Sequence, residues 1–272
     1  MELCKHLATD LITKVLPVFY DPKARSERFS RFVDKIMSGD CEKALHLQKS
    51  LGYALSDNTR YEYIFFLFGE STRNYKGTLM ESVLPVMGDY GKAVRAETIA
   101  LKKNPNSSQP TDDVARLAGV RFANISEPSR GLFLNSAQVK YMAGGDTLSA
   151  RFLHENSSDF NPQFKLHVNT NYLPVISDMT VFNSDRMQII PFNRHFEEWK
   201  QDKILKAKFS KKEVQSAILN WLLEGFTRLR DEGFKPPKSV LDAIFSYAHD
   251  SDKAQFVEYV LVKDQSSEIR TA

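Results

Sequence analysis

Cysteine and clusters of metal-binding residues are scarce in this sequence. The chain of 272 residues has 2 cysteines, Cys4 and Cys41, with no C-x-x-C pair and no cluster of cysteine and histidine. Two cysteines in a chain of this length exclude a disulfide scaffold, and without such a cluster there is no zinc signature. We therefore expect a hydrophobic core to hold the fold, as the 42% of hydrophobic residues allows.

Long apolar segments and a strong charge of one sign are also missing. The longest purely apolar run, residues 64–68, is far shorter than a bilayer span, and no apolar stretch follows Met1. These features exclude membrane, secreted and fibrous classes and predict a soluble, cytoplasmic protein. The net charge of +3, from 37 Lys and Arg against 34 Asp and Glu, permits a nucleic-acid partner but does not argue for one.

Hydrophobic periodicity divides the chain into three predicted parts: residues 1–57, 58–198 and 199–272. The first part predicts helices around residues 29–36 and 44–54, because apolar residues recur there at helical spacing. The last part predicts a helix over 214–229 and, after the break at Pro236-Pro237, another over 239–247. Both ends of the chain are therefore expected to be helical extensions of a central domain.

The central part alternates short apolar runs with helix-length segments. Four strands are predicted: residues 64–68, 120–125, 164–168 and 187–190. A helix is predicted over 78–84, ending before Pro85, and residues 102–112 predict an exposed loop rich in Asn, Ser and Pro. Strands separated by helices indicate βαβ units, so we expect an α/β fold with a mostly parallel sheet.

The segment after the first strand has the layout of a phosphate-binding loop. Gly69 ends the strand, and Lys76, Gly77 and Thr78 precede the predicted helix. Backbone amides and the helix dipole would face an anion, with the lysine on the phosphates and the hydroxyl on Mg²⁺. The usual pattern would need glycines at positions 70 and 75, and the hydroxyl is displaced by one residue. The alternative is an exposed polar turn.

Polar residues follow two further predicted strands. Glu127 comes after the second strand, where an acid beside a phosphate loop can hold Mg²⁺ or activate water. Asn171 comes after the third strand, where an amide can orient water and the γ-phosphate. A surface carboxylate and an ordinary Asn-Pro turn are the alternatives for these two residues.

Basic residues near the last two strands suggest contacts to charged partners. Arg186 and Arg194 flank the fourth strand, from which an arginine can reach the nucleotide of a neighbouring subunit. Two glycines at 144–145 precede Arg151 and His154, which suits a short hairpin presenting cations to a phosphate backbone. Arginines without a catalytic role and a hairpin without a partner are the alternatives.

Taken in order, these segments resemble the C-terminal helicase part of phage, plasmid and integrative-element primase–helicases, the superfamily 3 group that includes satellite-phage and poxvirus proteins. Eight motifs carry the resemblance: residues 51–55, 68–78, 87–90, 125–128, 144–147 with Ala150 and Arg151, 168–171 with Pro174, Arg186 with 190–192, and 218–225. The resemblance covers nearly the whole chain. Each motif alone is loose, and their shared order makes the resemblance specific.

The resemblance implies an AAA+-like P-loop sheet flanked by helices, assembled as a homo-oligomer, usually a hexameric ring, around single-stranded DNA. ATP with Mg²⁺ would be hydrolysed between subunits to drive 3′→5′ unwinding during replication of a mobile element. Residues 1–57 resemble the end of the linker domain of these proteins. Since the sequence starts midway through that linker, a primase is expected to be a separate partner.

The resemblance also assigns roles to individual residues. Lys76 would contact the β- and γ-phosphates, Thr78 would approach Mg²⁺, Glu127 would be the Walker B acid, Asn171 the γ-phosphate sensor and Arg186 the arginine finger. The nucleotide-binding loop would comprise Gly69, Asn74, Tyr75, Lys76, Gly77 and Thr78. The DNA-contacting segment would comprise Lys140, Arg151 and His154.

Two departures from the family pattern define rival hypotheses. Tyr75 replaces a glycine that lets the backbone approach the phosphate, and Glu127 is a single acid where many relatives have two. These departures predict weakened ATP binding, and so a second hypothesis is a DNA-binding or ring-forming module with an impaired ATPase. A third hypothesis takes Lys76 and Thr78 as the loop of a monomeric small-molecule kinase without DNA affinity.

Overall fold

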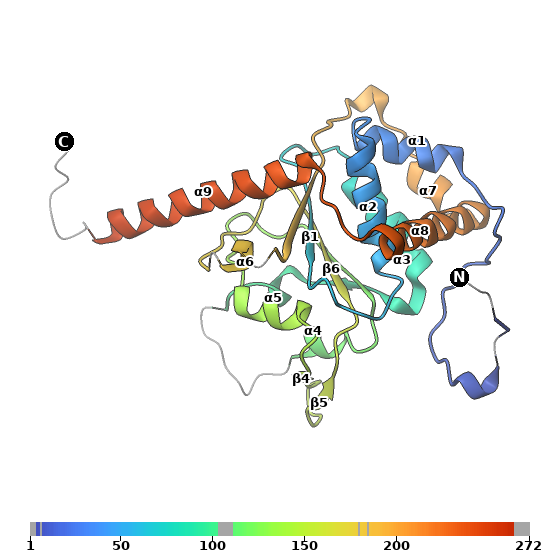
Figure 1. Ribbon diagram of the computed structural model, residues 1–272, viewed down its shortest axis with the longest axis horizontal. Coiled ribbons are helices and arrows are strands. Elements are labelled where there is room, and N and C mark those ends of the chain that lie inside the picture. The colour runs from blue at the N-terminus through green and yellow to red at the C-terminus, as the bar shows by residue number, and fades with distance from the viewer. Residues whose placement is uncertain (1–3, 6, 103–110, 179, 184, 264–272) are drawn as a thin grey trace.

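The centre of the protein is a five-stranded sheet; its parallel arrangement and four of its strands were predicted. The computed structural model describes residues 4–5, 7–102, 111–178, 180–183 and 185–263. The strand order is β2-β3-β6-β1-β7, and every neighbouring pair is parallel (Figure 1). The strands are β1 (Ile64–Phe68), β2 (Gly91–Val94), β3 (Phe122–Ser126), β6 (Lys165–Thr170) and β7 (Met187–Pro191).

Helices cover both faces of this sheet, which gives an α/β fold. The α-helices are α1 (Glu27–Ile36), α2 (Cys41–Tyr53), α3 (Lys76–Met87), α4 (Asp112–Ala115), α5 (Ser136–Ala143), α6 (Thr180–Asn183), α7 (Leu205–Phe209), α8 (Lys212–Glu232) and α9 (Lys238–Lys263). Short 3₁₀ turns are η1 (Ala8–Asp10), η2 (Gly88–Tyr90), η3 (Ala96–Thr98) and η4 (Glu198–Lys200). A separate antiparallel hairpin pairs β4 (Leu148–Ala150) with β5 (Ser158–Phe160).

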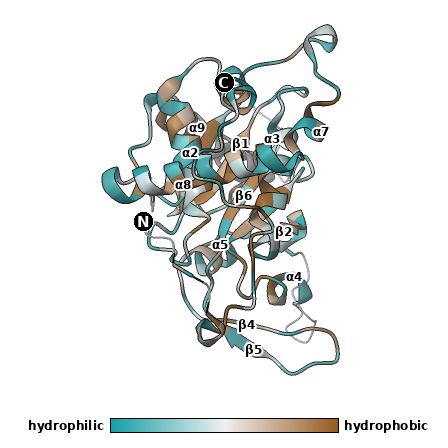
Figure 2. Ribbon diagram, turned by 90° about the vertical axis from the view of Figure 1, so that its right-hand side faces the viewer, coloured by the Kyte–Doolittle hydropathy of each residue, from teal (hydrophilic) through white to brown (hydrophobic). Residues whose placement is uncertain are grey.

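Two hydrophobic clusters lie on opposite faces of the sheet. Alternate residues of β1 belong to different clusters, with Phe65 and Leu67 in one and Ile64 and Phe66 in the other. This division follows from the pleat, since successive side chains of a strand point to opposite faces. Figure 2 shows the apolar residues concentrated in the sheet and in the helix surfaces that cover it. β1 is therefore buried on both sides, which explains why its sequence is a continuous apolar run.

The predicted N-terminal and C-terminal helical parts pack against each other. Helices α2 and α8 cross closely where each has a glycine. A Cβ atom on Gly52 would lie 2.4 Å from the Phe226 nitrogen, and one on Gly225 would lie 2.3 Å from the Gln48 oxygen. Since no side chain fits at either position, the two glycines allow the close crossing. Beyond this layer, the distal part of α9 extends away from the body (Figure 1).

Several predicted boundaries are wrong. The helix predicted to end before Pro85 continues to Met87, because this proline removes a single helical hydrogen bond and the buried side chains of Val86 and Met87 hold the last turn in the core. The last predicted helix extends past residue 247 to Lys263. Strand β2 was not predicted, and most of the predicted loop over 102–112 lies outside the described residues. Within the described ranges, no helix combines the length and apolarity needed to cross a membrane.

Candidate functional site

A polar cavity of about 420 Å³ lies at the carboxyl ends of β1, β3 and β6. These strands are adjacent and parallel, so the segments that follow them meet at one edge of the sheet. The lining residues come from the loop after β1, the first turns of α3, the ends of β3 and β6, and the segment before α7. They are residues 72–78, Glu81, Glu127, residues 169–171, Gln201, Asp202, Lys203, Leu205 and Lys206.

Lys76 is the buried cation of this cavity. It is 3% exposed, and its Nζ donates to the Asn171 Oδ1 at 2.8 Å and to the Gly69 carbonyl at 3.2 Å. Burial lowers the pKa of Lys76 from 10.5 to about 8, and the negative charge of Glu127 partly opposes this shift. The structure therefore brings together residues that stand 95 positions apart in the chain.

Gly69 makes room for that arrangement. A Cβ atom at this position would lie 2.6 Å from the Phe192 carbonyl oxygen, 2.7 Å from the Asn74 Nδ2 and 3.1 Å from the Lys76 Nζ. The Asn74 amide closes the loop, since its Nδ2 donates to the Ser71 carbonyl at 2.5 Å. Gly69 thus serves close packing around the lysine, although it does not itself line the cavity.

The first turn of α3 faces the cavity with its amides. The N-cap residue Tyr75 forms no side-chain hydrogen bond to this helix end, the Lys76 amide donates to the Asn74 Oδ1 at 3.4 Å, and Lys76, Gly77 and Thr78 all line the cavity. Thr78 is buried, and no described residue forms a hydrogen bond with its hydroxyl. At Gly77, the position where the usual pattern has the hydroxyl, an added Cβ atom would meet only the Asn169 Nδ2, at 3.8 Å. The positive end of the helix dipole at this N-terminus attracts anions.

Tyr75 has a left-handed backbone, with φ of 62° and ψ of 14°, directly before α3. Its ring packs edge-on against Phe196 and Phe32, with centroid distances of 4.8 Å and 5.8 Å. Its hydroxyl oxygen accepts a hydrogen bond of 2.9 Å from the backbone N–H of Asp202. The side chain therefore lies at the edge of the cavity and is held there by three contacts to distant segments.

Glu127 lies across the cavity from α3. It follows β3 with a left-handed φ of 52°, and its backbone N–H donates to the Asn169 carbonyl at 2.8 Å. The carboxylate is exposed to solvent, and Asn169 beside it is buried. Lys76, Asn171, Thr78 and Glu127, which the sequence assigned to one site, thus surround one cavity.

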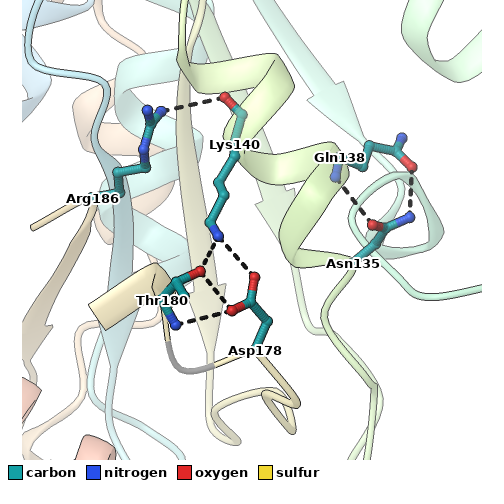
Figure 3. Close-up of polar contacts among 6 residues, drawn as sticks. All are labelled: Asn135, Gln138, Lys140, Asp178, Thr180 and Arg186. Carbon is teal, nitrogen blue, oxygen red and sulfur yellow. Dashed lines mark hydrogen bonds and ion pairs between the residues drawn. The ribbon is translucent and has the colours of Figure 1, made fainter. Parts of the chain in front are cut away.

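Arg186 is not part of this cavity. It precedes β7, and therefore lies at the amino end of the sheet, opposite the cavity. Its guanidinium forms an ion pair with Glu62, and Nη1 donates to the Lys140 carbonyl at 3.3 Å (Figure 3). Within one chain, Arg186 therefore lies away from the cavity that Lys76 lines.

The three predicted DNA-contacting residues have different surroundings. The Lys140 Nζ forms an ion pair of 2.7 Å with Asp178 and also contacts Thr180 (Figure 3). The hydrogen bond from Lys140 is the main cause that lowers the pKa of Asp178 to about 2. Arg151 and His154 lie in the connection between β4 and β5, where the Arg151 amide donates to the Thr111 hydroxyl at 3.0 Å.

No motif predicted that residues 201–206 belong to the site. This segment was assigned to the C-terminal helical part, yet Asp202, Lys203 and Lys206 line the cavity. Lys206 forms an ion pair of 2.5 Å with Glu81, and Lys203 lies 3.8 Å from Glu198. A cluster of lysines between 203 and 212 was the only local signal, and it does not reveal that the segment folds back onto α3.

This geometry is that of an α/β domain with a phosphate-loop layout, and the comparisons agree with it. No protein-family model matches the chain. The chain is 30% identical over 219 residues to "Putative helicase 022R" of Frog virus 3 (isolate Goorha), covering 74% of this chain and 22% of that protein. It is 28% identical over 221 residues to "Putative helicase L207/L206" of Acanthamoeba polyphaga mimivirus, covering 75% and 23%.

Solved structures share the fold. The apo structure of the NrS-1 C-terminal region, in its A form, matches with a TM-score of 0.61 at 13% identity, covering 88% of this chain and 55% of that one. A structure of residues 305–718 of that region has a TM-score of 0.57 and covers 95% and 64%. The solved structures show the fold alone, and the similarity to the viral proteins supports a helicase-type domain. The chain spans less than a quarter of the length of the viral relatives.

Proposed function

We propose that this chain is the ATPase part of a DNA helicase related to the superfamily 3 primase–helicases of mobile elements. One observation carries the proposal: the Lys76 ammonium, the Asn171 amide and the Glu127 carboxylate surround one cavity at the start of α3. The predicted ATPase core at 58–198, between the parts 1–57 and 199–272, belongs to this proposal. The cavity also uses residues beyond 198.

Each of these groups has a role in hydrolysis of the terminal phosphate of ATP. Lys76 would bind the β- and γ-phosphates together with the amides of the first turn of α3. Asn171, which holds Lys76 at 2.8 Å, would orient the γ-phosphate. Glu127 would accept a proton from the attacking water, since its carboxylate is exposed to the cavity.

Magnesium fits the oxygen groups that line the cavity. The Thr78 hydroxyl has no hydrogen bond to a described residue, and the Glu127 carboxylate lies at the same cavity. These two residues would hold Mg²⁺ together with the phosphates, and the ion would neutralise charge on the transferring phosphoryl group. In the described part of the chain, no three His, Cys, Asp or Glu residues form a metal site, and phosphate oxygens and water would supply the remaining ligands.

Assembly into a ring around single-stranded DNA is part of the same proposal. Arg186 lies away from its own cavity, so it would act only on the nucleotide of a neighbouring subunit, after leaving Glu62. The β4–β5 hairpin, with Arg151 and His154, would contact the DNA, and Lys140 would do so only by leaving Asp178. Hexameric stoichiometry, 3′→5′ polarity and a separate primase follow from the family resemblance.

An ATPase-impaired ring or DNA-binding module is the second candidate. Two observations favour it: Gly77 stands where the usual loop has a magnesium-binding hydroxyl, and Tyr75 stands where it has glycine. A chain of this kind would bind ATP weakly and turn it over slowly or not at all.

Single-stranded-DNA-stimulated ATP hydrolysis tests the proposal. Wild type is compared with Lys76→Ala and with Lys212→Ala, which changes an exposed lysine outside the cavity. Stimulated hydrolysis that only Lys76→Ala abolishes is the expected result. Binding of ATP and DNA without turnover would favour the impaired module. A monomer that transfers phosphate without affinity for DNA would overturn the proposal in favour of a kinase.

A further inference from the structure

We propose that Tyr75 is a positioning residue that holds residues 198–209 in place as the outer wall of the nucleotide cavity. The inference rests on the proposed nucleotide site, and it gives a function to the residue that departs most from the usual phosphate loop. The other explanation of this tyrosine is that it replaced the loop glycine and impaired nucleotide binding. The contacts of its side chain distinguish these two explanations.

The tyrosine hydroxyl contacts the wall directly. It accepts the backbone N–H of Asp202 at 2.9 Å, from a residue 127 positions away in the sequence. A glycine at position 75 could make no such bond. Because the contact goes to the backbone, it fixes the path of the segment whatever its side chains are. Asp202, Lys203 and Lys206 on this segment then face the cavity.

The ring of Tyr75 links the loop to two more elements. Phe196, which leads into the wall, and Phe32 of α1 both contact it edge-on. Both phenylalanines are buried, so the ring is anchored in the core and not in a solvent-exposed cluster. The three contacts reach two separate segments, residues 196–202 and α1, which is more than a tyrosine that merely replaced a glycine would be expected to form.

Asp202 extends this connection to the cations around it. Its carboxylate forms an ion pair of 2.6 Å with Lys208 and lies 3.8 Å from Arg28 of α1. Tyr75, Asp202 and Leu205 also line a second cavity of about 460 Å³ on the far side. The wall thus borders both cavities. Its later part is anchored in the core by the buried side chains of Leu205 and Phe209, so the tyrosine bond holds the part of the wall around Asp202.

The backbone conformation of Tyr75 agrees with this function. A φ of 62° is unfavourable for a tyrosine and free of cost for a glycine. Residues held in such conformations persist where the surrounding structure over-determines them, and such positions cluster at ligand sites. Here the hydrogen bond to Asp202 and the two ring contacts hold Tyr75 in its left-handed conformation.

Hydrogen exchange and ATP affinity test the proposal on the full chain. The variants are Tyr75→Phe, which keeps the ring and loses the hydroxyl, and Tyr75→Gly, which restores the usual loop residue. Tyr141→Phe is the matched control, because it also loses a hydrogen bond between a tyrosine hydroxyl and the backbone, here donated to the Thr147 carbonyl, at a residue that does not line the cavity. Exchange is measured by mass spectrometry on peptides covering 198–209, without nucleotide. Affinity is measured by calorimetry with ATP, and thermal unfolding checks folding.

We expect graded losses if Tyr75 positions the wall. Exchange in 198–209 should rise in Tyr75→Phe and further in Tyr75→Gly, with the control unchanged. The dissociation constant for ATP should rise about fivefold in Tyr75→Phe, which corresponds to one lost hydrogen bond. It should rise by at least about tenfold in Tyr75→Gly, which also loses the ring contacts.

Two results would overturn the inference, and a third concerns only the proposed function. Unchanged exchange in 198–209 in both variants would show that Tyr75 does not hold the wall. Tighter ATP binding by Tyr75→Gly than by wild type would show that the tyrosine is an obstruction. If exchange rises from wild type to Tyr75→Phe to Tyr75→Gly but wild type binds no ATP, the positioning role stands and the nucleotide site is refuted.

Discussion

Replacement of Gly69 by alanine tests the packing around the lysine of the cavity. The added Cβ atom would lie 2.6 Å from the Phe192 carbonyl oxygen, which belongs to the backbone and cannot rotate away. The Phe192 amide in turn donates to the Phe68 carbonyl at 2.6 Å, so the two segments are held together on either side of the clash. Relief therefore requires the end of β1 to move away from the end of β7.

The expected cost follows from these distances. Overpacking of a well-packed site lowers the free energy of unfolding by about 1–3 kcal/mol. Because the added Cβ atom would contact backbone at so short a distance, we expect Gly69→Ala to fall near the middle of that range, at about 2 kcal/mol. For a chain of this size, a loss of that magnitude lowers the melting temperature by roughly 4–8 °C. ATP affinity should fall as well, because the same Cβ atom would displace Asn74 and Lys76, at 2.7 Å and 3.1 Å.

Denaturant unfolding of Gly69→Ala beside Gly77→Ala measures this cost. The second variant places a Cβ atom 3.8 Å from its nearest neighbour, inside a helix. It should be neutral or more stable by up to about 1 kcal/mol, because alanine is the better helix former. Equal stability of Gly69→Ala and wild type would refute the packing argument. Equal losses in both variants would show that any change in this loop is destabilising.

Three further predictions address other residues. Glu127→Gln should retain ATP affinity in calorimetry and lose turnover, since it keeps the shape of the side chain without the basic carboxylate; unchanged turnover would exclude Glu127 as the base. Arg186→Ala should lose hydrolysis while Glu62→Gln, which breaks the same ion pair, keeps it; equal losses would mean that the pair acts only in folding. Burial lowers the pKa of Lys165 from 10.5 to about 7. The unfolded chain therefore binds more protons between these values, and stability should rise with pH there by roughly 1 kcal/mol per unit. Denaturant unfolding at pH 7 and pH 9 should show that increase in wild type, and an equal slope in Lys165→Met would contradict it.

Much of the fold follows from local patterns that a reader can find in the sequence. The apolar run of β1 and the helical spacing in α1 and α8 predicted those elements with small errors at the ends. Strand β2 escaped prediction because it is a short edge strand, Gly91–Val94, with side chains only partly buried. An edge strand needs less apolar sequence than a central one, so its pattern is weaker.

Only the part of the candidate site that lies next to the predicted strands could be predicted from the sequence. The loop from Gly69 to Thr78 is a contiguous motif, and Glu127 and Asn171 follow strands that the topology brings to the same edge. The outer wall at 201–206 has no motif. Its place depends on contacts such as the one between Tyr75 and Asp202.

Local sequence was sufficient to predict four of the five strands, the main helices and the loop between β1 and α3, because those features depend on neighbours within a few positions. The interpretation of Tyr75, the separation of Arg186 from its own cavity and the crossing of α2 with α8 depended on the three-dimensional structure. Each of these features is a contact between residues far apart in the chain. Such contacts depend on how the strands are ordered and how the helices pack, and no short stretch of sequence encodes that order.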